Sequence, residues 1–190
     1  FFRDWATRKN GQSLTDLVVQ VNDILESMSF KGRFAAFTLG LLDIKSGDFR
    51  VCNAGDNLID ILDGATGRLE QRKLPSPPAA GVFPSDLVEM RGGFQEVKLR
   101  LKSGDTAILY TDGIEESMHI LRDPQYNVHA VTEEDHSSGR VPSEESDDPR
   151  APNKIDVGQQ REEFGTWRIY AVVEALQKQK QLADRREREV

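Results

Sequence analysis

The chain has 190 residues, the length of one ordinary domain, and its 32 acidic and 25 basic residues give a net charge of −7. This acidic balance argues against nucleic acid and against an anionic membrane surface as partners, because both need a basic face. A single cysteine cannot form an internal disulfide, and no apolar stretch is long enough to span a bilayer. We therefore expect an acidic, cytoplasmic domain that makes no direct membrane contact.

The chain begins with Phe1 and Phe2, and neither a methionine nor a helix-capping residue precedes them. Such a beginning is typical of the interior of a helix, and we expect a fragment of a longer protein. Ser13 can cap a helix over residues 14–28, whose apolar residues recur at helical spacing and predict one buried face. That face comprises Leu14, Leu17, Val18, Val21, Ile24, Leu25 and Met28.

Six segments between residues 33 and 110 have the length of strands and are separated by turn signals. They are residues 33–43, 48–54, 58–62, 68–74, 95–101 and 106–110. The first four form two predicted hairpins, and the proline-rich residues 75–81 then predict a loop at a sheet edge. Hairpins in succession indicate antiparallel sheets in an α+β fold.

Residues 118–160 differ from the rest, because they are acidic, polar and interrupted by four prolines. We predict an acidic insertion that is mostly irregular, has one short strand at residues 125–131 and lies outside the core. A last helix follows. Its predicted buried face comprises Phe164, Ile169, Val172, Val173 and Leu176.

Asp112 and Gly113 follow the strand predicted over residues 106–110. A carboxylate at the end of a strand is firmly held and still reaches solvent, as a hard metal ion requires, and Gly113 would let the backbone turn away. Asp-Gly pairs are also common turn signals, so the pair alone supports either interpretation. Residues 53–57 can likewise be a polar turn beside a site or a plain hairpin connection.

Taken in order, these segments resemble the SpoIIE-like branch of the metal-dependent (PPM-type) protein serine/threonine phosphatases. The resemblance covers residues 1–117 and 161–182, and its most specific part is the stretch GDTAILYTDGIEES. The other matching parts are the NAG hairpin, the LPSPPAAG loop and the EFG that opens the last helix. The resemblance implies a sandwich of antiparallel sheets between helices. It also implies two Mn²⁺ or Mg²⁺ ions that activate a water for attack on a phosphoserine.

Carried over by position, the resemblance implies that Asp112 and Gly113 belong to the metal site. The neighbours that it implies for the site are Glu116, Asn53, Gly55 and Asp56. Asp56 departs from the family, because histidine is usual there and a carboxylate adds negative charge. No catalytic residue beyond the metal ligands is expected.

Other metal-site aspartates of the family have no counterpart in this chain: one in an early strand, one before the first long helix and the terminal pair. We therefore expect a partial phosphatase domain over residues 1–190, inactive by itself and weak in binding Mn²⁺ or Mg²⁺. We also expect an unpaired apolar sheet edge that favours self-association.

For the parent protein, the resemblance implies a bacterial-type signalling phosphatase that acts on a regulatory phosphoprotein, such as an anti-sigma factor antagonist. The alternative is a binding module that uses the phosphatase scaffold without chemistry, a hypothesis that the aspartate at position 56 favours. Two correctly placed aspartates upstream of this chain would favour the enzyme.

Overall fold

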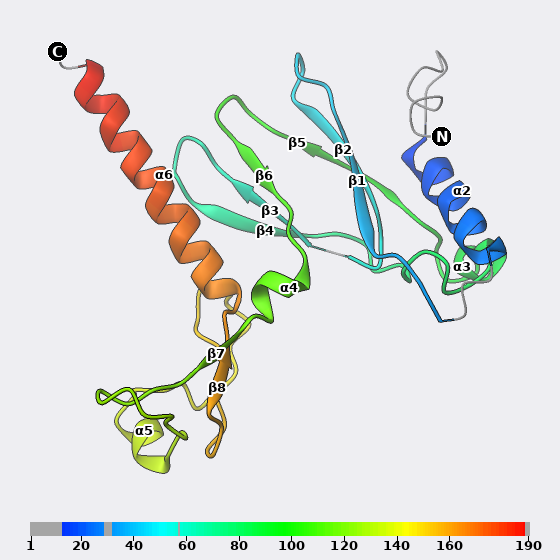
Figure 1. Ribbon diagram of the computed structural model, residues 1–190. Helices are drawn as coiled ribbons and strands as arrows, with labels where there is room; N and C mark the ends of the chain where they lie inside the picture. The colour runs from blue at the N-terminus through cyan, green and yellow to red at the C-terminus, as the bar shows by residue number, and fades with distance from the viewer. Residues whose placement is uncertain (1–12, 29–31, 57, 189–190) are drawn as a thin grey trace. The chain divides into compact units, whose positions relative to one another are not determined.

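The computed structural model describes residues 13–28, 32–56 and 58–188, so the expectations for Phe1 and Phe2 lie outside the described residues. Two compact units make up the chain (Figure 1). Unit 1 consists of residues 1–61 and 71–107, and unit 2 consists of residues 62–70 and 108–190.

The two predicted helices and the six strands predicted before residue 110 occur in the predicted order, and the structure adds three short helices and two short strands that the sequence analysis did not predict. In chain order, the elements are α2 (Leu14–Ser27), β1 (Phe37–Leu42), β2 (Asp48–Ala54), β3 (Leu58–Leu62), β4 (Leu69–Lys73), α3 (Ser85–Glu89), β5 (Glu96–Arg100), β6 (Thr106–Ile108), α4 (Asp112–Glu115), β7 (Met118–Ile120), α5 (Glu133–Ser137), β8 (Arg161–Glu163) and α6 (Thr166–Arg188). The sheets have the orders β1-β2-β5, β4-β3-β6 and β7-β8. Strand β2 is antiparallel to both β1 and β5, and β7 is antiparallel to β8. The α+β class with antiparallel sheets is confirmed.

Helix α2 begins where the sequence predicts. The Ser13 hydroxyl accepts a hydrogen bond from the Asp16 amide at 3.1 Å, and a carboxylate oxygen of Glu96 accepts one from the Leu14 amide. The predicted apolar face is buried over the first turns, but Ile24 and Met28 are exposed. The prediction was therefore wrong for the last turn of the helix.

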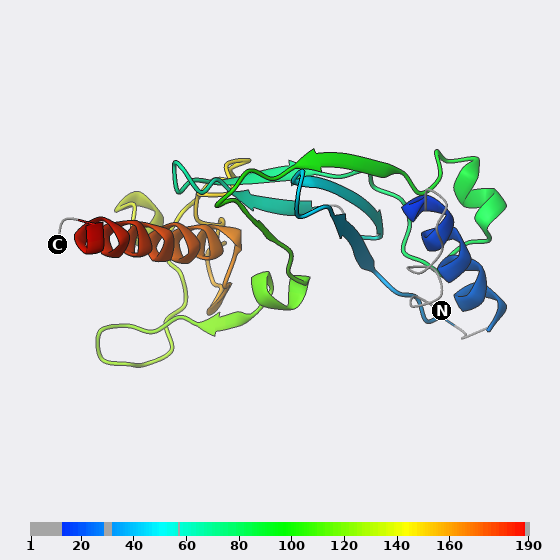
Figure 2. The ribbon, with the colours of Figure 1, turned by 90° about the horizontal axis from the view of Figure 1, so that it is seen from above.

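Strand β2 has apolar side chains on both faces. Phe49 and Val51 pack with Ile59 of the second sheet, while Cys52 lies in a separate cluster with residues of α2. Because successive side chains of a strand point to opposite faces, unit 1 has the first sheet between α2 and the second sheet. Figure 2 shows α2 and α3 side by side in this unit.

The two predicted hairpins have the same turn. Asp43 accepts hydrogen bonds from the amides of the two residues that follow Ile44, and Asp63 does the same for Ala65 and Thr66. Each turn ends at a glycine with positive φ. A Cβ at Gly47 would lie 2.1 Å from the Leu101 carbonyl oxygen, so this glycine cannot be replaced without moving the strand.

In unit 2, one face of α6 packs on residues 62 and 69, at the two ends of the turn between β3 and β4. Tyr170 is buried together with Leu62 and Leu69. Val172 and Leu176, which the sequence predicts to be buried, are 52% and 59% exposed. Ile169 is buried and Val173 packs against the Tyr170 cluster, as predicted. Tyr170, however, takes the place that the prediction gave to Val172 and Leu176.

Residues 118–160 are mostly irregular, as predicted, but the short strand expected over 125–131 is wrong. Val128 makes only an isolated bridge with Arg122, because Asp123 accepts the amides of Gln125 and Asn127 and bends the chain there. A strand occurs instead at Met118–Ile120 and pairs with β8.

The same segment is fastened to the rest of unit 2. Within the described residues, none of the three hydrophobic clusters includes a residue of this segment, yet Val131 and Ile155 are buried. Arg150 donates to Glu174 at 2.8 Å and to the Leu69 carbonyl, and its guanidinium lies 5.0 Å from the Tyr170 ring centroid.

Across the parts of the chain that the structure describes, no helix combines the length and the apolar character needed to cross a membrane.

Candidate functional site

Asp112 does not stand at the end of a strand, contrary to the sequence prediction. Strand β6 ends at Ile108, and Asp112 is the first residue of the short helix α4, with Thr111 as its N-cap. Gly113 lies inside this helix, where a Cβ would meet only the Thr111 Oγ1 at 3.7 Å. The Asp-Gly pair therefore begins a helical turn and presents an exposed carboxylate at its start.

Helix α4 is fastened to the residues that open α6. The Gly165 amide donates to the Glu115 carbonyl at 2.9 Å, and the Phe164 amide donates to the Ser117 carbonyl at 2.8 Å. The Thr166 hydroxyl donates to the Glu115 carboxylate at 3.2 Å. The Asp112 motif and the EFG motif, 50 residues apart in the sequence, thus meet in unit 2.

The conformation of the EFG turn depends on a glycine at position 165. Gly165 has a φ of +74°, and a Cβ there would lie 3.1 Å from the Trp167 ring and 3.2 Å from the side chain of Asn153. Arg168 stacks at 4.3 Å on the Trp167 ring centroid and donates to the Phe164 carbonyl at 2.7 Å. The same turn supplies the two backbone amides, of Phe164 and Gly165, that bind the segment containing α4.

In the hairpin motif of unit 1, Asn53 and Ala54 are buried and Gly55 is exposed, and the Asn53 Oδ1 atom has no hydrogen-bond partner among the described residues. Asn53 is 1% exposed, and its Nδ2 donates to the Asp56 carbonyl and, at 2.9 Å, to the Pro75 carbonyl. Gly55 has a φ of +83°, and a Cβ there would lie 3.0 Å from the Cβ atoms of Ala36 and Ala79. The motif therefore ties the proline-rich loop to the end of β2.

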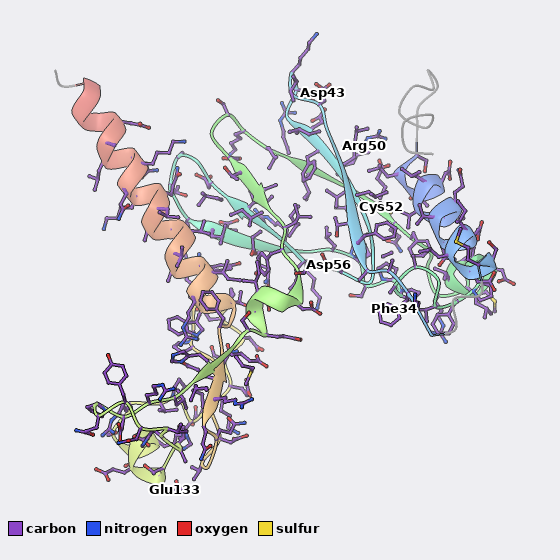
Figure 3. All side chains as sticks on the ribbon, in the orientation of Figure 1. Phe34, Asp43, Arg50, Cys52, Asp56 and Glu133 are labelled. Atoms are coloured by element: carbon purple, nitrogen blue, oxygen red, sulfur yellow. The ribbon has the colours of Figure 1, made fainter. Side chains whose placement is uncertain are left out.

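Asp56 follows this motif at the end of β2 opposite to the Asp43 turn (Figure 3). Its carboxylate accepts hydrogen bonds from the Thr38 hydroxyl at 3.3 Å and from the Leu58 amide at 3.4 Å. Both bonds are long, and they give Asp56 a role in the turn.

The predicted site residues fall into two groups. Asn53, Gly55 and Asp56 lie together in unit 1, and Asp112, Gly113 and Glu116 lie together in unit 2. Glu116 is exposed. The structure adds Glu115 and Thr166, which the sequence analysis did not single out. The signal available in the sequence was the presence of two matching motifs, TDG and EFG, whose contact only the fold reveals.

The family resemblance implies Mn²⁺ or Mg²⁺, and the described residues do not fit a complete site for these ions. In ranges 13–28, 32–56 and 58–188 there is no group of three or more His, Cys, Asp or Glu residues that could hold a metal ion. Such ions need several oxygen ligands in near-octahedral order. Asp112 offers one exposed carboxylate, and that of Glu115 is engaged with Thr166.

A family model described as Stage II sporulation protein E (SpoIIE) matches residues 3–147, which is more than half of the chain. The chain belongs to the SpoIIE family. The matched range includes the hairpin motif and the Asp112 motif and ends within the predicted insertion. Strand β8 and helix α6, which hold α4, follow that range.

No curated protein matches the chain. Among solved structures, the RsbU and RsbW domains of a Mycobacterium tuberculosis protein are similar at 22% identity and a TM-score of 0.43, over 56% of this chain and 27% of that one. The phosphatase domain of SpoIIE from Bacillus subtilis is similar at 16% identity and a TM-score of 0.33, over 70% of this chain and 58% of that one. The chain thus spans less than two thirds of either structure.

Proposed function

We propose that the protein containing this chain is a metal-dependent protein serine/threonine phosphatase. Its substrate is a regulatory phosphoprotein, such as an anti-sigma factor antagonist. Asp112 contributes one carboxylate to a Mn²⁺ or Mg²⁺ site whose other ligands lie outside the described residues. Such ions, when bound, supply the hydroxide and neutralise the phosphate oxygens.

The position of Asp112 supports this proposal most directly. Its carboxylate is exposed within the range that the SpoIIE family model matches, on a helix anchored by backbone hydrogen bonds from Phe164 and Gly165. A ligand for a hard cation needs this combination of access and a fixed backbone. The hairpin residues Asn53 and Gly55 support the proposal only as parts of the scaffold, because both are committed to the fold.

The test is hydrolysis of an aryl phosphate and of a phosphoserine peptide by the full-length protein with Mn²⁺. Asp112→Asn keeps the side-chain size but removes the charge, and we expect it to lower kcat/KM by at least about 100-fold. Asp147→Asn is the matched control, because Asp147 is also an exposed carboxylate of unit 2 and should leave the activity unchanged.

Equal activity of Asp112→Asn and wild type would refute the assignment of Asp112. If the wild-type protein hydrolyses neither substrate but binds a regulatory protein, the alternative of a binding module is correct. In that case Asp112→Asn would leave the affinity for the regulatory protein unchanged.

A further inference from the structure

We propose that Glu115 and Thr166 are positioning residues, whose hydrogen bond sets the place of α4 and thereby of the Asp112 carboxylate. This inference rests on the proposed function, because it takes Asp112 as the residue that acts. According to this inference, the first residue of α6 determines where the Asp112 carboxylate lies.

Helix α4 is short and exposed, and the Ser117 hydroxyl donates a hydrogen bond to its Gly113 carbonyl at 2.7 Å. It has four residues, none of which is buried, and its N-cap Thr111 makes no side-chain hydrogen bond to the helix. A single helical turn is not stable by itself in water, because nucleation fixes several residues for very few hydrogen bonds. The place of Asp112 therefore depends on contacts made by the rest of the segment.

Those contacts come from the residues that open α6. Two are backbone hydrogen bonds, from Gly165 to Glu115 at 2.9 Å and from Phe164 to Ser117 at 2.8 Å. The third joins side chains, from the Thr166 hydroxyl to the Glu115 carboxylate at 3.2 Å. The pairing of β7 with β8 continues directly from the second of these bonds.

The Glu115 carboxylate is also well placed electrostatically. Thr166 is the first residue of α6, a helix of 23 residues, and a helix N-terminus carries a partial positive charge that attracts a carboxylate. Glu115 is half-buried, whereas the next acid, Glu116, is exposed. Position 115 therefore links the two helices, and a shift of the start of α6 moves α4 with it.

Two pairs of variants of the full-length protein test this link. Thr166→Val removes the hydroxyl at nearly constant shape, whereas Thr166→Ser retains the hydroxyl and removes only the methyl group. Glu115→Ala removes the acceptor, and Glu115→Gln retains an oxygen acceptor without the charge. Misplacing a reacting group by about 1 Å can cost about 100-fold in rate. For Thr166→Val and Glu115→Ala we therefore expect a 10- to 100-fold fall in kcat with KM changed less than about twofold.

Rescue separates positioning from a general loss of stability. Thr166→Ser and Glu115→Gln should recover kcat to within about threefold of wild type. Thr106→Val is the matched control, because Thr106 is an exposed residue of β6, and it should leave kcat unchanged. If Thr166→Ser is as impaired as Thr166→Val, or if the fall in kcat merely follows a fall in melting temperature, the proposal is overturned.

Hydrogen exchange of the metal-free protein gives a readout that does not require activity. The amides of Phe164 and Gly165 should exchange at least about tenfold faster in Thr166→Val than in wild type and Thr166→Ser. Unchanged exchange and unchanged kcat in an active enzyme would overturn the inference and leave the proposed function standing. Faster exchange in a protein that hydrolyses nothing would confirm the link and refute the proposed function.

Discussion

Asn53 in unit 1 is almost completely buried, and its amide joins the carbonyls of Asp56 and Pro75. Asp112 in unit 2 is exposed, and its helix is held through Glu115 and Ser117 instead. Both residues belong to motifs of the same family resemblance. The difference teaches that the Asn53 motif stabilises the fold, whereas the Asp112 motif presents an exposed carboxylate to solvent.

The glycines of the two motifs give the largest expected contrast. Gly55→Ala should destabilise the protein by about 2–3 kcal/mol, because it adds a strained positive φ to close contacts with Ala36 and Ala79. Gly113→Ala should be neutral or stabilising by up to about 1 kcal/mol, because the site is helical and open. Urea unfolding of the two variants checks this contrast, and equal losses would remove the distinction between the motifs.

The polar side chains should differ in the same direction. Asn53→Ala leaves the half-buried Pro75 and Asp56 carbonyls without the donor of the buried Asn53 amide, and we expect a loss of about 2 kcal/mol in the free energy of unfolding. Asp112→Ala should change it by less than about 0.5 kcal/mol, because the side chain is exposed. The measurement is again urea unfolding. A loss above about 1 kcal/mol for Asp112→Ala would show that the fold depends on this carboxylate.

Asp135 extends the comparison to a second carboxylate of unit 2, one that is buried. It accepts hydrogen bonds from the Thr132 hydroxyl and amide, from His129 and from Arg140, each at 2.8–2.9 Å. The hydrogen bonds from Thr132 and His129 hold the pKa of Asp135 well below its ordinary value of 3.8.

A group whose pKa is lowered in the folded state stabilises that state above its unfolded pKa, and the effect disappears as the pH falls. We therefore expect the NMR signals of residues 129–140 to keep their folded positions from pH 7 to about pH 5, to begin to weaken below about pH 4 and to be lost only as the pH falls through the lowered pKa of Asp135. Asp135→Asn should weaken the folded signals already at pH 7, and Asp147→Asn should not. Folded signals in Asp135→Asn at every pH would contradict this role.

The smallest effect is expected at Asp56, where the family usually has histidine. Its two accepted hydrogen bonds are long, and Asp56→Asn retains an oxygen acceptor for both. We expect a change of less than about 0.5 kcal/mol in the free energy of unfolding and unchanged phosphatase activity. A large fall in kcat would show that Asp56 acts in the reaction, and that unit 1 also contributes a functional carboxylate.

Much of unit 1 was predictable from the sequence, because its signals are local. Ser13 caps α2, and the strands 48–54 and 58–62 have the predicted bounds. Unit 2 was less predictable. The apolar residues 109 and 110 extend the strand pattern, but the pairing of β6 ends at Ile108 and the chain enters α4.

The sequence by itself determined the two long helices, the order of the first six strands, the turns at Asp43 and Asp63 and the family. These depend on periodicity, on short-range hydrogen bonds and on ordered motifs, which neighbouring residues specify. Only the tertiary structure decided that Tyr170 is buried while Val172 and Leu176 are exposed, and that Glu115, not Glu116, contacts Thr166. Both outcomes depend on contacts between residues about 50 or more positions apart, whose geometry no local pattern records.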